Sequence, residues 1–170
     1  MPIPMRLLPA LALLPGLALA AEQQARPQRL GAFQSWTAAT HQEGRSKVCY
    51  AFARPSRSES GKRDGVMLTV TERPNQRDAV ILTPGYTYPR DAEVQVKVGA
   101  TELPFYTAGS AAAARDGQAA IRAFRTGKEA VARAPGPGGR GETVDVFPLD
   151  GFAQAYDAIL EECPARARKR

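Results

Sequence analysis

Residues 141–163 show the clearest pattern of apolar and polar positions in the chain: a short strand runs directly into a helix. Six side chains of this helix recur at helical spacing and share one face: Phe152, Ala155, Tyr156, Ile159, Leu160 and Cys163. We expect Asp150 to be the N-cap, because its carboxylate can accept the free N–H groups of the first turn. Pro164 then stops the helix. The pattern predicts a C-terminal helix with Cys163 on its buried side.

Strands are predicted for most of the chain before this helix. In residues 48–53 the small side chains Cys49, Ala51 and Ala53 share one face and larger ones the other, so a helix backbone can come close on the small side. Residues 93–98 alternate valine with polar residues, and Gly99 and Ala100 can turn the chain back into a second strand at 101–106. The same signals predict further strands at 66–71, 79–83, 128–133 and 143–149.

One further helix interrupts the strands. Asp116 is placed to cap a short helix that runs through Arg125, with Gly127 just after its end. The predicted order is many short strands, a helix, two more strands and a terminal helix. This order predicts a mainly β, single-domain fold: an antiparallel β-sandwich or open barrel with a short helix and a C-terminal helix. A parallel α/β fold would need a helix after almost every strand. We expect Trp36 to anchor the core, because its ring brings a large area to bury.

The first twenty residues are typical of a secretory signal peptide. Arg6 precedes an apolar run at 7–14, and Ala18 and Ala20 are the small residues of a cleavage signal. We therefore expect cleavage after Ala20 and a location in the periplasm, outside the cell or at the outer membrane, with no membrane-spanning segment left. The mature chain would hold 170 − 20 = 150 residues. We divide it into a flexible lead-in at 21–30, one β domain at 31–164 and a basic tail at 165–170.

The chain has two cysteines, Cys49 and Cys163. In an oxidising compartment, two cysteines usually form one structural disulfide, and we expect that bond here. There is no Cys-x-x-Cys motif, and the single histidine, His41, leaves no credible set of metal ligands. The sequence therefore predicts neither a metal site nor a cofactor.

The chain is basic, with 23 lysines and arginines against 17 acidic residues, and its net charge of +6 becomes +5 once Arg6 is removed. Four of these cations are close together at the end of the chain: Arg166, Arg168, Lys169 and Arg170. They are candidates for contact with an anionic surface, and the alternative is a frayed, solvated terminus. Nucleic acid is not an expected partner for an exported protein.

Several short motifs follow one another in order along nearly the whole mature chain: Phe33 to Trp36, Val48-Cys49-Tyr50-Ala51, Leu68-Thr69-Val70-Thr71-Glu72-Arg73-Pro74, Pro84-Gly85-Tyr86, the helix before Gly127, Arg140-Gly141-Glu142-Thr143, Leu149-Asp150-Gly151-Phe152 and Cys163. This ordered set resembles the invasion-associated locus B (IalB) family of exported bacterial proteins. Residues 111–114 and 135–139 depart from the pattern. The resemblance implies a mainly β periplasmic or surface-associated protein, in a family whose founding member is linked to entry of a pathogen into host cells. It brings no catalytic residues.

Catalytic alternatives find little support in the residues. His41 is expected in a polar loop, with no nucleophile elbow for a Ser-His-Asp triad. Asp145 and Asp150 are the candidates for a glycosidase acid/base pair, but Asp150 is already predicted to be a helix cap and Asp145 to make local hydrogen bonds. The glycine-rich loop at 136–141 lacks the Gly-Lys-Ser/Thr ending of a phosphate-binding loop. We therefore do not expect an enzyme.

Two classes of function remain. The first is a non-enzymatic protein that binds a protein or an anionic component of the cell envelope or a host surface. The second is a periplasmic ligand-binding or inhibitor protein of the small disulfide-bonded β type. An enclosed apolar pocket would favour the second class, and a flat charged surface the first.

Overall fold

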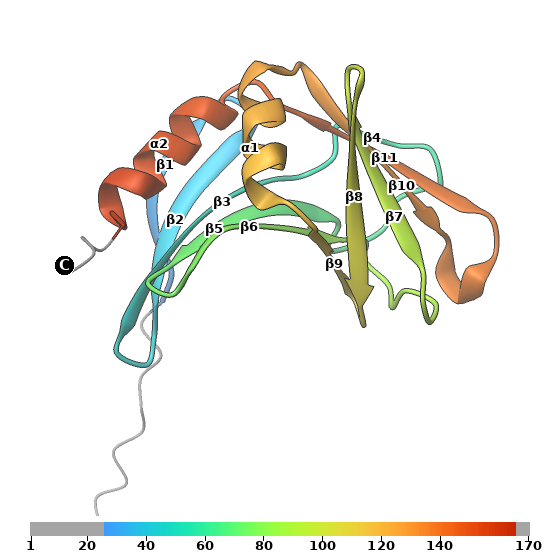
Figure 1. Cartoon of the computed structure of the whole chain (residues 1–170), viewed down its shortest axis with the longest axis horizontal. Helices are drawn as coiled ribbons and strands as arrows, with labels where there is room; N and C mark the ends of the chain where they lie inside the picture. Colours follow the sequence, from blue (N-terminus) through green and yellow to red (C-terminus); the bar gives the residue numbers. More distant parts are fainter. Residues whose placement is uncertain (1–25, 166–170) are drawn as a thin grey trace, which may run out of the picture.

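The fold is a single antiparallel sheet that bends into an arch, with two helices packed on one side of it (Figure 1). It is seen in a computed structural model that describes residues 26–165. The strands are β1 Gln28–Phe33, β2 Trp36–Glu43, β3 Ser46–Ala53, β4 Arg57–Ser58, β5 Met67–Arg73, β6 Gln76–Thr83, β7 Glu93–Val98, β8 Thr101–Ala108, β9 Ala111–Ala114, β10 Glu129–Pro135 and β11 Glu142–Pro148. The helices are α1 Gly117–Thr126 and α2 Phe152–Glu162, with a 3-10 turn, η1, at Pro137–Gly139.

The sheet is open. Its eleven strands follow the order β1-β2-β3-β5-β6-β9-β8-β7-β10-β11-β4, and every pair of neighbours is antiparallel. The two end strands, β1 and β4, each pair with one neighbour, so the sheet does not close into a barrel. This confirms the mainly β fold with two helices. Of the two architectures predicted from the sequence, the open barrel is the nearer, because all described strands belong to one sheet.

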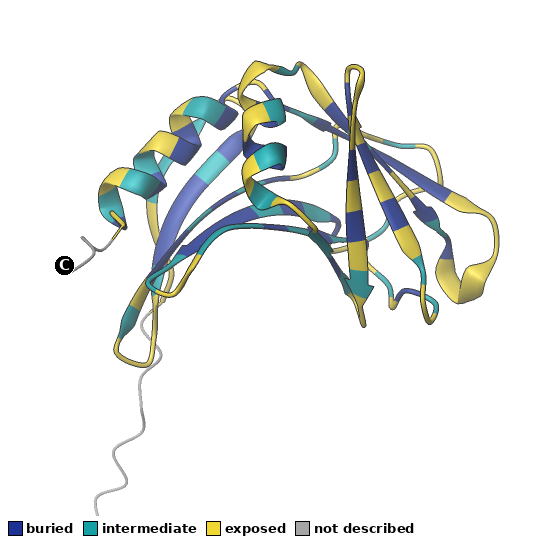
Figure 2. Cartoon of the chain, viewed as in Figure 1, coloured by how far each residue is buried: buried dark blue, intermediate teal, exposed yellow. Residues whose placement is uncertain are grey.

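Alternation along the strands decides which face meets the helices. Leu68 and Val70 of β5, Val80 and Leu82 of β6, and Val94 of β7 are almost fully buried in one core. The inward faces of α1 and α2 complete this core, which appears in Figure 2 as buried bands alternating with exposed ones along the strands. The apolar face of an open sheet needs such a cover, since apolar surface left in water costs about 25 cal/mol per Å².

Trp36 is the predicted core anchor, and the structure confirms it. Its side chain is fully buried, and its indole Nε1 donates a hydrogen bond to the carbonyl of Pro148 at 2.9 Å. The ring meets Phe152 of α2 edge to face, with 4.8 Å between centroids. The tryptophan therefore joins β2, the end of β11 and the start of α2.

The short helix α1 begins as predicted. Asp116 is its N-cap, and Oδ1 of Asp116 accepts a hydrogen bond from the N–H of Ala119 at 2.9 Å. Gly127 follows the helix for a reason of space. A Cβ at this position would lie 2.2 Å from Cγ1 of Val98, so only glycine lets the chain pass this close to β7.

The predicted cap of α2 is wrong. The N-cap is Gly151, at φ +84°, and Asp150 makes no capping bond. A Cβ on Gly151 would lie 1.9 Å from the carbonyl oxygen of Phe33, so a glycine is required where α2 starts against the β1–β2 turn. Asp150 instead accepts a hydrogen bond from the hydroxyl of Ser35 at 3.0 Å, which ties the same turn down.

Two further expectations need correction, the start of the β domain and the place of His41, and two short strands, β4 and β9, were not predicted. The β domain begins at Gln28, within the segment expected to be a flexible lead-in, because β1 pairs with β2 from that residue. The segment 54–65 contains β4, which adds a short edge to β11. The alanine run at 111–114 is a strand, β9, and it links β6 to β8. His41 lies in β2 and is not in a loop.

The predicted disulfide is present. Cys49 of β3 and Cys163 at the end of α2 are bonded, with 6.0 Å between their Cα atoms. Cys49, Ala51 and Ala53 form the small, fully buried face on which α2 rests. The bond thus fixes the last turn of the helix across β3, 114 residues away in sequence.

We predict that Cys163→Ser lowers the free energy of unfolding by about 2–5 kcal/mol. On the chain-entropy model, a crosslink over this sequence separation constrains the unfolded chain by at most about 5 kcal/mol. Denaturant unfolding followed by circular dichroism measures the change. Cys49→Ser and the double variant should lower the free energy of unfolding by the same amount. A reducing agent should lower the free energy of unfolding of the wild type to that of the variants. Equal midpoints for the wild type and both single variants would show that the bond does not form.

Candidate functional site

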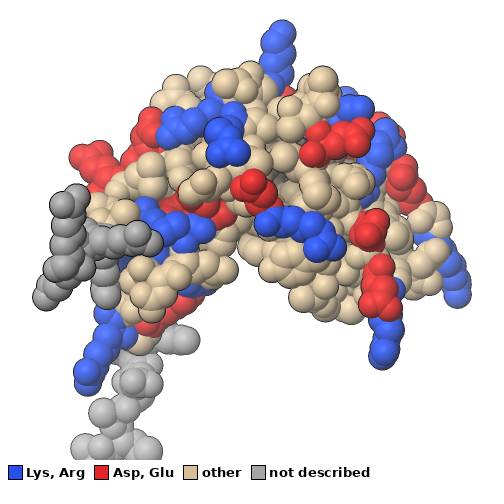
Figure 3. Space-filling view, in the orientation of Figure 1, with Lys and Arg blue, Asp and Glu red and all other residues tan. Residues whose placement is uncertain are grey.

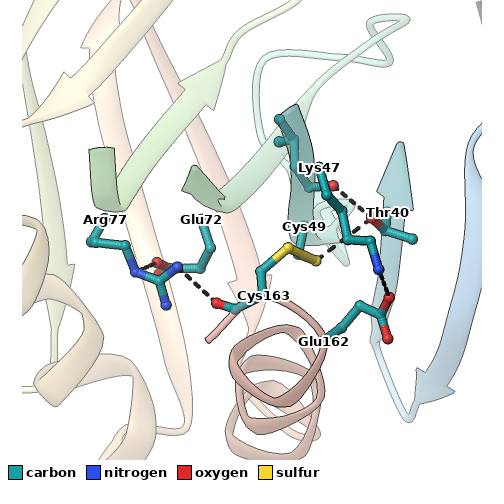
Figure 4. Close-up of a disulfide and its surroundings, with 8 residues drawn as sticks. Thr40, Lys47, Cys49, Glu72, Arg77, Glu162 and Cys163 are labelled. Atoms are coloured by element: carbon teal, nitrogen blue, oxygen red, sulfur yellow. Dashed lines mark hydrogen bonds and ion pairs between the residues drawn. A yellow bond between two sulfur atoms is a disulfide. The ribbon is translucent and has the colours of Figure 1, made fainter. Parts of the chain in front are cut away.

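The C-terminal end of α2 is held to the sheet by several contacts besides the disulfide (Figure 4). Nη1 of Arg77 donates a hydrogen bond to the carbonyl of Cys163 at 2.7 Å, which satisfies one of the free carbonyls of the last turn. Lys47 of β3 pairs with Glu162, and this pair is exposed. Thr40 lies beside the disulfide, with its hydroxyl donating to the carbonyl of Val48 at 2.9 Å. The helix therefore ends at a fixed point on the surface.

A buried carboxylate stands next to this point. Glu72 of β5 is fully buried, and its Oε1 accepts a hydrogen bond from the backbone N–H of Asp78 at 3.1 Å. Nε of Arg77 lies 2.6 Å from Oε2 of Glu72, an ion pair without the alignment of a hydrogen bond. The side chain of Asp78 accepts a hydrogen bond from the hydroxyl of Tyr156 on α2. A polar cluster thus links β5, β6 and α2.

Burial decides the protonation of this cluster. Removal from water raises the pKa of Glu72 from 4.5 to about 7. This outweighs the lowering by the Arg77 charge and by the backbone N–H of Asp78, while the Asp78 carboxylate raises the pKa further. Burial, followed by the hydrogen bond to Asp78, also raises the pKa of Tyr156. We interpret the cluster as a structural element, because Glu72 has no exposed surface through which to meet a substrate.

A second buried ion pair lies at the other end of the sheet. Asp145 of β11 is buried and accepts hydrogen bonds from Ser58 of β4 and from Nη2 of Arg63. Nε of Arg63 donates to the carbonyl of Pro84 at 3.0 Å, and its guanidinium lies over the ring of Tyr86. Arg63 therefore fixes the segment 54–66 onto the sheet.

Two open clefts adjoin on this fixed segment. The first has a volume of about 360 Å³ and is lined by Arg54, Pro55, Ser56, Arg57, Ser58, Lys62, Arg63, Asp64 and Val66. The second has a volume of about 340 Å³ and is lined by Ser35, Thr37, Phe52, Ala53, Arg54, Ser56 and Pro148. Four cations against one acid give the first cleft the chemistry of an anion site. Neither cleft is an enclosed apolar pocket.

Two further clefts occur in the described part of the chain. The larger, of about 530 Å³, lies between the β7–β8 turn and the end of α1, near Gly127 and Lys128. The smaller, of about 240 Å³, lies at the end of α2 and is lined in part by Arg45, Lys47 and Arg77. Figure 3 shows acidic and basic groups interspersed on the face in view. The local arrangement of charge therefore matters more than the net charge.

The residues weighed for catalysis are engaged elsewhere. Asp145 forms an ion pair with Arg63, while Asp150 is exposed and accepts a hydrogen bond from Ser35, so each carboxylate has a different partner. Nε2 of His41 lies 3.2 Å from Oε1 of Glu43, and its ring meets Tyr50 edge to face. In residues 26–165 no three metal-ligating side chains come together. The predicted signal peptide and the four tail cations, Arg166, Arg168, Lys169 and Arg170, lie outside the described residues.

Glu72 and Arg63 are the functional or structural residues that the sequence analysis missed. Alternation could have found Glu72, because it continues the inward face of Leu68 and Val70 along β5. No local signal marks Arg63, whose partners Asp145 and Pro84 belong to distant parts of the chain.

Within residues 26–165, no helix has the length and apolar character needed to span a membrane.

The comparisons with known proteins agree with this fold. The profile of the invasion associated locus B (IalB) protein family matches residues 36–160. Among solved structures, the crystal structure of invasion associated protein B from Bartonella henselae is similar, with 17% sequence identity and a TM-score of 0.56. The match covers 78% of this chain and 95% of that one, and at this identity it shows the fold alone. No curated protein matches.

We predict that Glu72 makes stability fall as pH rises toward neutrality. Between about pH 4.5 and 7 the folded state keeps a proton on Glu72 that the unfolded state releases, so this contribution is complete below that window and lost above it. Glu72→Gln should remove the dependence, because its amide oxygen can still accept from Asp78. Urea unfolding measured across this pH range should show that the free energy of unfolding falls by about 2–3 kcal/mol more in the wild type than in the variant. Glu129→Gln, at an exposed site on β10, is the control, and equal pH slopes for the wild type and Glu72→Gln would contradict the assignment.

Proposed function

This chain belongs to the invasion associated locus B family, and we propose on that basis that it is an exported protein that binds anionic groups of the cell envelope or a host surface without catalysis. The observation that carries the proposal is the fixed end of α2. The disulfide and Arg77 hold this end in place, and the cationic sequence 166–170 follows it directly. Cations that start from a fixed point can act together on an anionic surface.

The chemistry of the carboxylates supports binding over catalysis. Asp145 and Glu72 are buried beside arginines, so neither is placed to move a proton to or from a substrate. The clefts in the described residues are open and partly polar, and this supports a surface-binding protein over a carrier that encloses an apolar ligand.

Export is the first testable part of the proposal. Ala18 and Ala20 are the small residues that precede the predicted cleavage site, so the mature chain should begin at Ala21. Intact-mass measurement on protein from the periplasm or the medium of an expressing bacterium checks this. Ala20→Tyr, which places a bulky side chain at the site, should leave the precursor uncleaved. A wild-type protein that keeps Met1 would exclude this route of export.

The tail is the second testable part. Truncation after Pro164 should leave folding intact but reduce retention on vesicles rich in phosphatidylglycerol at least tenfold, because each cation near an anionic membrane contributes about 1 kcal/mol. Co-sedimentation at about 0.05 M and 0.5 M salt measures this, and the difference between the chains should shrink at high salt as screening increases.

The matched control removes an equal number of positive charges, four, from exposed positions of the folded domain. Its substitutions are Arg90→Gln, Lys97→Gln, Arg122→Gln and Lys128→Gln. It should retain most of the vesicle binding. If the control loses as much as the truncated chain, net charge and not the tail is responsible. Equal retention of the truncated and full-length chains at low salt would show the tail to be a solvated end.

A further inference from the structure

We propose that the two adjoining clefts on segment 54–66 form one groove that binds an acidic oligosaccharide, with its anionic groups at the arginine-rich end and its sugar rings against Phe52. The proposal deepens the proposed function, since it names a ligand class and places it on the folded domain. It does not depend on the tail. The groove is defined by the residues that line the two clefts, which share Arg54 and Ser56.

The cationic end of the groove has charges free to meet a ligand. Arg54 and Lys62 are exposed, and neither has an ion-pair partner among residues 26–165. Arg57 is paired loosely with Glu59, at 3.7 Å on an exposed surface, so a ligand carboxylate can compete for it. Asp64 is the one acidic residue in the lining. This arrangement suits an anion that carries hydrogen-bond acceptors, such as a uronate carboxylate.

The segment that carries these cations is held rigidly. Arg63 is anchored to Asp145 and to the carbonyl of Pro84, and β4 pairs with β11 through Arg57 and Ser58. The backbone N–H of Ser56 also donates to the carbonyl of Val146 at 2.8 Å. Because these bonds fix the backbone in advance, binding costs less loss of chain freedom than it would on a mobile loop.

The other end of the groove has the chemistry of a sugar-binding surface. Phe52 points away from the helices, since its neighbours Ala51 and Ala53 are the residues buried in the core. Its ring is half-buried and stacks with Tyr50, with 6.1 Å between centroids. The C–H face of a sugar ring packs on such an aromatic surface because both shed water. The hydroxyl of Thr37 is a hydrogen-bond partner for sugar hydroxyls.

A row of uncharged side chains continues from Phe52 across the same face of the sheet to Tyr106, over whose ring the guanidinium of Arg115 lies, and a row of this length favours an oligomer over a single sugar. Strand pairing places one residue from each of six neighbouring strands in a row on this face: Thr37, Phe52, Thr69, Ile81, Ala113 and Tyr106. Tyr106, at the end of the row, is 48% exposed. Beyond Ser35 at the groove's far end lies Asp150, so the anionic groups of the ligand belong at the opposite end, near Lys62.

The test uses the full mature chain with Arg166, Arg168, Lys169 and Arg170 replaced by glutamine, so that failure of the tail proposal and failure of the groove are separate results. The probe is the α-1,4-linked galacturonic acid tetramer, compared with its neutral galactose counterpart and with inorganic phosphate. Calorimetry measures affinity, and amide chemical shifts locate the contact. We expect the acidic tetramer to bind at least tenfold more tightly than either comparison ligand, with shifts in residues 52–63.

Arg54→Gln with Lys62→Gln should weaken binding of the acidic tetramer at least tenfold and reduce its salt dependence. Phe52→Val should weaken it at least threefold and leave the salt dependence unchanged, because this variant removes only apolar contact. Arg90→Gln with Arg122→Gln removes the same charge from exposed sites outside the groove and should change the affinity less than twofold.

Three results would overturn the groove. If the neutral tetramer or phosphate binds as tightly as the acidic tetramer, one of the two ends of the groove is not needed for binding. If the control pair of variants loses as much affinity as the groove pair, the effect is one of net charge. Absence of binding at low salt, with the fold intact by circular dichroism, would leave the clefts without this ligand.

Discussion

The structure depends on one requirement: an open sheet must cover its apolar face. Here α2 supplies much of the cover, and it is fixed at both ends. At its start, Gly151 allows the chain to press against the carbonyl of Phe33, and at its end Cys163 is bonded to Cys49. Trp36 and Phe152 fill the space between β2 and the helix. Without a fixed helix, the face that carries Cys49 and Ala51 would be open to water, at a cost that a domain of this size can ill tolerate.

Two ion pairs, each with a buried carboxylate, hold separate parts of the sheet in place. Glu72 and Arg77 join β5 and β6 below the end of α2, while Arg63 and Asp145 fix the segment 54–66 against β11. Buried pairs of this kind seldom add much net stability, since both charges lose their water, but removal of one partner is costly. Their effect is to select one position for each segment. At the β11 end, that position leaves Arg54 and Lys62 exposed on a rigid backbone, which is the physical basis for the proposed groove.

Both binding proposals share one electrostatic principle. Positive charge is concentrated in two places: the sequence after α2 and the segment around β4. Elsewhere in residues 26–165 some basic residues are matched, as Lys47 is by Glu162 and Arg125 by Asp157, and others such as Arg90 and Arg122 are single exposed charges that line neither cleft of the groove. A net charge of +6 therefore says less about binding than the places where cations gather. Exposed contacts of this kind favour fast, salt-sensitive attachment to an anionic surface.

The sequence by itself determined those features that local chemistry controls. Alternation predicted β7, and the turn at Gly99 and Ala100 predicted β8. Helical spacing predicted α2, and the cap of α1 at Asp116 followed from its side chain. The disulfide followed from there being two cysteines. Tertiary structure decided the rest. Asp150 lost its predicted cap role because the approach of Phe33 requires Gly151 at that position, a contact between residues 118 positions apart. The alanines of β9 form a strand because β6 and β8 lie on either side of them. Only 12% of the Arg63 side chain is exposed, because distant Asp145 compensates its charge. Such choices depend on neighbours that only the folded chain brings together.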